Sequence, residues 1–216
     1  MSGTVPDNEI AKENPKTMAF NIDPAKTALL VMDYQPSILG FLDDPTDFVA
    51  STAETVATVR NNGGSVGYVR VGFTDADYAG FPEGHIMGDR VKGNRPNMDA
   101  ESTTTALHPN LVVHDNDIVV RKTRVSAFST TTLHEQLTNA GITTLILAGV
   151  HTSGVVLTTV REAHDLDYRV IVLSDACADP DDAVHSFLFE KIFPKQAEVA
   201  TSAELLSALP ARAATN

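Results

Sequence analysis

Three segments that follow buried strands carry the residues that could do chemistry. Asp33 follows the apolar segment TALLVM (residues 27–32), Lys122 follows DIVVR (residues 117–121), and a turn of small residues covers residues 150–154. The carboxyl ends of parallel strands share one edge of a sheet, so an acid, a base and a turn lined with backbone N–H groups would meet there. Taken singly, Asp33 could cap a turn and Lys122 could pair at the surface, and spacing alone favours these structural roles.

The turn lies in the segment from Thr143 to Ala163, which has the pattern of a strand, a tight turn and a helix. An apolar run, Leu145 to Ala148, ends at Gly149, as a buried parallel strand would. From Val155 the apolar residues recur with helical spacing. The start of such a helix offers free backbone N–H groups to a ligand, so we expect the active site here.

The remaining segments alternate between apolar runs and amphipathic ones, which predicts an α/β fold with a parallel sheet of about six strands and helices on both faces. We expect strands over residues 27–32, 65–71, 117–121, 145–148, 169–173 and 198–200, and helices over residues 48–62, 131–140, 155–163, 180–192 and 202–209. Residues 72–106 are rich in Gly, Pro, Asp and Asn, and we expect an irregular segment that folds over the edge of the sheet. Residues 1–20 predict a flexible N-terminal arm, and residues 21–216 a single domain.

Composition excludes several classes of partner. A formal net charge of −12 and a pI near 4.8 argue against nucleic acid and against an anionic membrane surface. Cys177 is the only cysteine, so neither an internal disulfide nor a multi-cysteine metal site is expected. The first residues, MSGTVPDNEIAKENPK, lack the apolar region of a signal peptide, and no apolar run is long enough to span a membrane. We therefore expect a cytoplasmic protein, and export without a signal peptide stays open.

Three segments, in this order, resemble motifs of the isochorismatase-like (cysteine hydrolase) family: LLVMDYQ, VVRKTRVSAFSTTTL and LAGVHTSGVVLTTVREAHDLDYRVIVLSDACAD. The similarity covers about residues 26–209. It implies a parallel sheet flanked by helices, no cofactor, and assembly into a dimer or a tetramer. The catalytic aspartate and lysine of the family correspond to Asp33 and Lys122, whereas its catalytic cysteine corresponds to Val155.

The family's nucleophile is therefore absent from this chain. Cys177 follows the next strand, in SDACAD, and a buried cysteine of this kind usually has a packing role. Thr152 and Ser153 lie in the turn but have no evident base beside them, so we expect them to satisfy N–H groups of the turn and the helix start.

Members of the family that resemble isochorismatase itself cleave a vinyl ether without the cysteine. In these members the matching aspartate protonates the enol-ether methylene, water adds, and the hemiketal collapses to pyruvate and a dihydrodiol. The resemblance thus implies that Asp33 is the general acid and that Lys122 orients it or binds a substrate carboxylate. Lys122 would lower the pKa of Asp33, whereas burial and a bound dianion would raise it.

Two other functions stay open. Val155 is bulkier than the glycine expected in the isochorismate-cleaving members, and its methyl groups could fill the site of a catalytically silent family member that binds a small ligand. A cysteine-independent amidase ranks last.

A small anionic substrate is the expected partner. Its predicted contacts are Gln35, His151, Thr152, Ser153, Gly154, Arg90 and Arg95. His151 matches an aromatic substrate contact of the isochorismate-cleaving members, although a structural role is as plausible. The segment GDRVKGNRP, which contains Arg90, Lys92 and Arg95, lies near the family's substrate-gripping arginine, with a solvated loop as the slightly favoured alternative.

Two local features complete the expectation. The family often has a non-proline cis peptide at the bond that corresponds to Val150–His151. Asp75, Asp77 and His85 lack the spacing of a nicotinamidase-like metal site, so we expect no catalytic metal.

Overall fold

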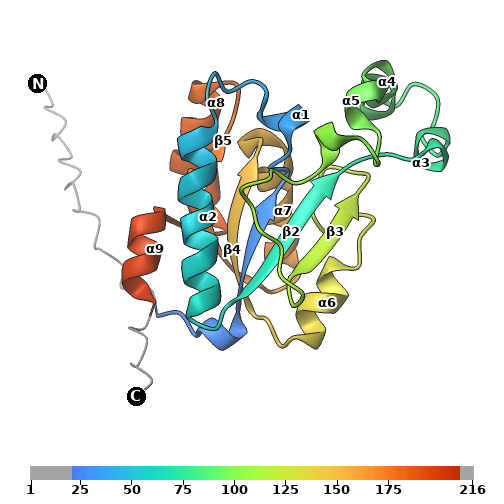
Figure 1. Ribbon diagram of the computed structural model, residues 1–216. Helices are drawn as coiled ribbons and strands as arrows, with labels where there is room; N and C mark the ends of the chain where they lie inside the picture. The colour runs from blue at the N-terminus through green and yellow to red at the C-terminus, as the bar shows by residue number, and fades with distance from the viewer. Residues whose placement is uncertain (1–20, 210–216) are drawn as a thin grey trace, which may run out of the picture.

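The computed structural model describes residues 21–209, so the predicted N-terminal arm over residues 1–20 lies outside the described residues. Six strands form one all-parallel sheet with the order β3-β2-β1-β4-β5-β6, which confirms the predicted fold class (Figure 1). The strands are β1 (Thr27–Met32), β2 (Ser65–Val71), β3 (Ile118–Lys122), β4 (Thr144–Val150), β5 (Arg169–Ala178) and β6 (Glu198–Ala200).

The two central strands of the sheet are buried along their whole length. Apart from the threonine that begins each of them, β1 and β4 are apolar, because helices cover both faces of a parallel sheet. Along the chain, β1, β2 and β3 follow one another toward one edge, and β4 then returns to the other side of β1. The boundary between β1 and β4 is therefore the topological switch point, where open α/β sheets bind their ligands.

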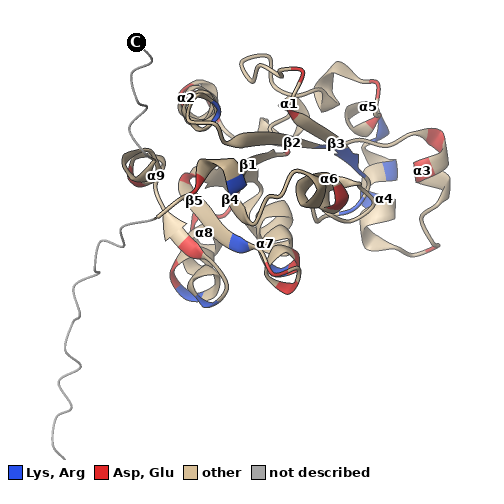
Figure 2. Cartoon of the chain, turned by 90° about the horizontal axis from the view of Figure 1, so that it is seen from below, with Lys and Arg blue, Asp and Glu red and all other residues tan. Residues whose placement is uncertain are grey.

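Helices form a layer on each face of the sheet. Figure 2 shows α2 and α9 on one side and α6, α7 and α8 on the other. The helices of these layers are α2 (Thr46–Asn61), α6 (Leu133–Asn139), α7 (Leu157–Asp165), α8 (Asp182–Phe187) and α9 (Ser202–Ala208). Each layer buries its own apolar cluster against the sheet. No helix within residues 21–209 has the length and apolarity needed to cross a membrane.

The expectation of an irregular segment over residues 72–106 is wrong. This part of the chain forms a small helical lobe beyond the ends of β2 and β3 (Figure 1, upper right). Its helices are α3 (Asp75–Ala79), α4 (Ile86–Gly93) and α5 (Arg95–Met98). Phe73, Tyr78 and Phe81 lie at its centre in an apolar cluster that also contacts Ile38, on the short helix α1 (Pro36–Leu39).

The strand that was predicted over residues 169–173 is longer than expected. β5 pairs regularly with β4 up to Val172, the register then shifts, and pairing resumes with Cys177 opposite Gly149 and Ala178 opposite Val150. Such an irregularity lets a strand continue past a local bend. Cys177 is thus a buried residue inside β5, not one that follows the strand.

Candidate active site

Asp33 lies directly after β1, at the switch point, in a turn that its neighbours anchor. Its backbone has a φ of 60°, in the left-handed region that aspartate tolerates better than most residues. The next residue, Tyr34, is buried, and its hydroxyl lies 2.9 Å from Thr52 Oγ1 and donates to the Ala176 carbonyl at 2.8 Å. These contacts tie the turn to α2 and β5, so the Asp33 carboxyl is held in a fixed place.

Lys122 is the last residue of β3 and forms a buried ion pair with Asp33. Its Nζ lies 2.8 Å from Asp33 Oδ2 and donates a second hydrogen bond to the Arg124 carbonyl at 3.2 Å. Both side chains are almost completely buried. Asp33 Oδ1 is also buried, yet it has no hydrogen-bond partner among the described residues. A buried acceptor without a partner is costly, so Oδ1 is available for a proton or a ligand.

Burial decides the direction in which the pKa of Asp33 moves. Desolvation raises it, and this effect exceeds the opposing effects of the charge and hydrogen bond of Lys122 and of the charge of His151. The pKa of Asp33 therefore lies above the ordinary value for an aspartate. The carboxyl is thus easier to protonate than a solvated aspartate, even with Lys122 in contact.

The turn after β4 has the predicted cis peptide between Val150 and His151. A single π-helical turn, Thr152–Val156, follows it and leads into α7, so the helix begins later than its predicted start at Val155. Gly149 permits this close approach, because a Cβ atom there would lie 2.8 Å from Val156 Cγ2. Val155 is only 2% exposed and packs in the apolar cluster on the α6 and α7 side of the sheet.

His151 is partly buried and feels the charges of two acids, Asp179 and Asp33. Its pKa is lowered by desolvation, against the charges of Asp179 and Asp33, so the neutral ring is favoured. The Phe41 ring packs edge-on against the imidazole, with 5.0 Å between ring centroids. His151 is thus close to the Asp33 carboxyl and has one apolar wall.

Asp179 and His185 were not predicted, and both hold the turn. Asp179 Oδ2 accepts a 2.7 Å hydrogen bond from the backbone N–H of Ser153. The hydroxyl of Thr152 lies 2.8 Å from His185 Nδ1. The expectation that the Thr152 and Ser153 hydroxyls satisfy N–H groups of the turn is thus wrong, because the Thr152 hydroxyl bonds to His185 and the N–H of Ser153 is satisfied by Asp179. Asp179 directly follows β5, so the rule that selected Asp33 could have found it had the full strand been predicted.

Two further predicted contacts, Gln35 and Gly154, lie directly before α1 and in the turn after β4. Gln35 is fully buried, and its amide is engaged by the backbone of Val71 and Thr105. Gly154 lies inside the π-helical turn.

The basic cluster of the lobe lies apart from the acid. Arg90 and Lys92 are exposed on α4, whereas Arg95 pairs with Asp75 and lies over the Tyr78 ring. None of the three contacts Asp33 or Lys122 among the described residues. Within residues 21–209, no three His, Cys, Asp or Glu side chains converge as metal ligands.

Comparison with known proteins identifies the family. A model of the isochorismatase domain matches residues 27–204. The isochorismatase family protein YwoC of Bacillus subtilis (strain 168) is 33% identical over 187 residues, which cover 87% of this chain and 96% of YwoC. The ureidoacrylate amidohydrolase RutB of Pseudomonas syringae pv. syringae (strain B728a) is 30% identical over 208 residues, which cover 86% of this chain and 85% of RutB.

A solved structure agrees with these sequence matches. The structure of an isochorismatase family protein from Burkholderia thailandensis superposes with a TM-score of 0.74 at 32% identity, covering 88% of this chain and 97% of that one. The resemblance seen in the three sequence motifs is thus confirmed, and Cys177, which lies in β5, is the only cysteine of the chain. The chain belongs to the isochorismatase family of hydrolases, and it has a valine where the resemblance places the family's catalytic cysteine.

Proposed function

We propose that this protein cleaves the vinyl ether of isochorismate, or of a similar enol-pyruvyl ether, by acid-assisted hydrolysis without a covalent intermediate. Asp33 donates a proton to the methylene carbon of the enol ether, and water adds to the resulting oxocarbenium carbon. The water returns a proton to the Asp33 carboxylate, and the hemiketal collapses to pyruvate and a dihydrodiol. This route needs a proton donor and no nucleophile at position 155.

One observation carries the proposal: the two oxygens of Asp33 have different surroundings. Oδ2 accepts from Lys122 at 2.8 Å, and Oδ1 is buried without a partner among the described residues. A proton on this carboxyl would therefore reside on Oδ1 and could be donated from there. The raised pKa of Asp33 supports a protonated donor, and a bound carboxylate-bearing substrate would raise it further.

The first test is release of pyruvate from isochorismate, followed by coupled reduction to lactate. We expect release by the wild-type protein and a loss of at least about 100-fold in kcat for Asp33→Asn, since general acid catalysis contributes on the order of 10²–10⁴-fold. Circular dichroism establishes that the variant is folded. Asp165→Asn, which changes an exposed aspartate on α7, is the matched control and should retain full activity.

The outcomes separate this proposal from its two alternatives. Wild-type protein that is folded, binds isochorismate and releases no pyruvate would instead be a catalytically silent member that binds a small ligand. The buried Val155 methyl groups at the cysteine position favour that second candidate. Similarity to RutB makes an amide or ureido compound the next substrate to assay. Activity that Asp33→Asn leaves intact would end the role of Asp33 as the acid.

A further inference from the structure

Arg124 lies two residues beyond the catalytic lysine, in the loop that follows β3. Its backbone carbonyl accepts a 3.2 Å hydrogen bond from Lys122 Nζ, the same ammonium that contacts Asp33. One charged group thus bridges the proposed acid and the Arg124 backbone. The backbone of Arg124 is therefore fixed against the ammonium group that pairs with Asp33.

The guanidinium of Arg124 is partly buried and has no carboxylate partner within residues 21–209. Its NH1 donates to the Thr123 carbonyl at 2.6 Å, and its Cζ lies 4.1 Å from the centroid of the Phe81 ring. None of the described carboxylates lies within ion-pair distance of it. This is notable in a chain with 28 acidic and 16 basic residues other than histidine.

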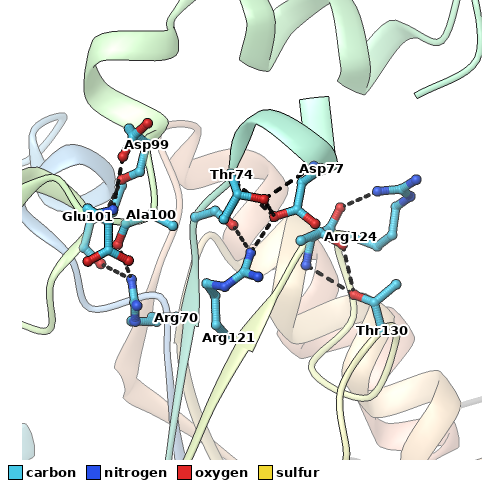
Figure 3. Close-up of polar contacts among 12 residues, drawn as sticks. Arg70, Thr74, Asp77, Asp99, Ala100, Glu101, Arg121, Arg124 and Thr130 are labelled. Atoms are coloured by element: carbon cyan, nitrogen blue, oxygen red, sulfur yellow. Dashed lines mark hydrogen bonds and ion pairs between the residues drawn. The ribbon is translucent and has the colours of Figure 1, made fainter. Parts of the chain in front are cut away.

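Arg121, three residues before Arg124, does have a carboxylate partner. Its NH1 donates to Asp77 Oδ2 and to the Gly72 carbonyl, each at 2.7 Å. Figure 3 shows Arg121 against Asp77, with the Arg124 guanidinium outside this pair. Arg121 therefore holds the lobe to β3, whereas the charge of Arg124 is left for another group.

We infer that Arg124 binds a carboxylate of the substrate and makes the site selective for carboxylate-bearing ligands over neutral ones. This inference rests on the proposed function for the identity of the reaction, but not for the binding step. A planar guanidinium can hold a carboxylate through two parallel hydrogen bonds, and the Phe81 ring supports one of its faces. Lys122 has three ammonium protons and uses two in the contacts described, so it can donate the third to the same ligand.

The position of Phe81 links this binding to the lobe. Phe81 belongs to the apolar cluster of the lobe, which also contacts Ile38, five residues after Asp33. Arg124 therefore stands where the lobe, the end of β3 and the turn of Asp33 meet. A carboxylate bound by both Arg124 and Lys122 would contact the same ammonium that pairs with Asp33.

The test measures affinity for a charged ligand and for its neutral ester, by calorimetry. The probes are chorismate, a dicarboxylate with an enol-pyruvyl ether, and its dimethyl ester. We expect wild-type protein to prefer the dicarboxylate, and Arg124→Gln to weaken its binding by about 10- to 100-fold while leaving the ester unchanged. Arg124→Lys should recover part of the affinity, because it restores the charge but not the planar fork.

Arg161→Gln is the matched control. Arg161 is exposed on α7 and hydrogen-bonds to Gln196 at 3.2 Å, so its loss should change neither affinity. If Arg124 only held the lobe in place through Phe81, Arg124→Gln would lower the melting temperature. It would also reduce the affinity for the dicarboxylate and for the ester by the same factor. That result, or a wild-type protein without preference for the dicarboxylate, would overturn the inference.

Turnover distinguishes the inference from the proposed function. With isochorismate as substrate, Arg124→Gln should raise KM far more than it lowers kcat, since its contact is made in the ground state as well. Wild-type protein that releases no pyruvate but binds chorismate through Arg124 would refute the reaction and leave the binding role standing.

Discussion

The side-chain amide of Gln35 pairs with the backbone of Val71 as a neighbouring strand would. Its Oε1 accepts from the Val71 N–H and its Nε2 donates to the Val71 carbonyl, both at 2.7 Å. Nε2 also donates to the Thr105 carbonyl at 2.6 Å. Gln35 thus extends the sheet beyond the end of β1 and joins it to Thr105, near the end of the lobe.

Gln35→Leu should destabilise the protein strongly. It leaves an N–H and two carbonyls without their partners in a fully buried place, at a cost on the order of 1–3 kcal/mol for each. We expect the free energy of unfolding in urea to fall by about 3 kcal/mol or more. Gln136→Leu on α6, which removes only a bond to Thr132, is the control. A loss no larger than that of the control would contradict this role.

The ion pair predicts how activity depends on pH. If Asp33 must be protonated, kcat/KM falls as the pH rises through its pKa, which is raised chiefly by desolvation. Lys122 is the largest of the effects that lower this pKa. Lys122→Met should therefore move the fall of kcat/KM to higher pH, even though the maximal rate drops. If the fall stays at the same pH or moves to lower pH, it does not reflect the titration of Asp33.

Activity should not depend on the single cysteine. Burial raises the pKa of the Cys177 thiol to about 12, so the reactive thiolate is scarce at neutral pH. We expect iodoacetamide at pH 7.5 to leave both the mass and the activity of the folded protein unchanged. The same reagent should alkylate one site in urea. Cys177→Ser is the control. If iodoacetamide lowers the activity of this variant as much as that of the wild-type protein, modification of the thiol is not the cause of the loss.

Asp179 makes the stability of the turn depend on pH. Desolvation would raise its pKa, but hydrogen bonds from Ser153 and Asp181 and the charge of His151 lower it overall. A carboxyl with a lowered folded pKa contributes stability above its unfolded pKa of about 3.9 and loses it as the pH falls through the folded value. Asp179→Asn should thus cost most near pH 7 and least in strong acid. Urea unfolding at several pH values measures this, and a pH-independent difference would contradict it.

The sequence placed Asp33 and Lys122 at the ends of predicted strands, and the resemblance to the family then gave them catalytic roles that spacing alone did not favour. The structure joins the two side chains at 2.8 Å. Asp179 was missed because the register of β4 and β5 shifts, and only this irregularity carries the strand on to Ala178. A local pattern does not reveal pairing between strands.

The lobe was missed for a different reason. Its helices α3, α4 and α5 have only 5, 8 and 4 residues, too short for a helical period to emerge among glycines and prolines. Arg124 lies in the motif VVRKTRVSAFSTTTL, but its packing over the ring of Phe81 joins residues 43 positions apart and could not be predicted from a local pattern.

The place of β3 in the sheet ties the chemistry to an edge strand. Asp33 follows a strand that is paired on both sides, but Lys122 ends an edge strand that pairs only with β2 among the described strands. Edge elements open locally more easily than the whole domain unfolds. Each such opening separates the lysine from the acid and leaves most of the sheet intact, so catalysis should fade at urea concentrations where the circular dichroism is still native. Loss of activity would then report the local free energy of opening of β3, whereas circular dichroism reports the global stability of the domain.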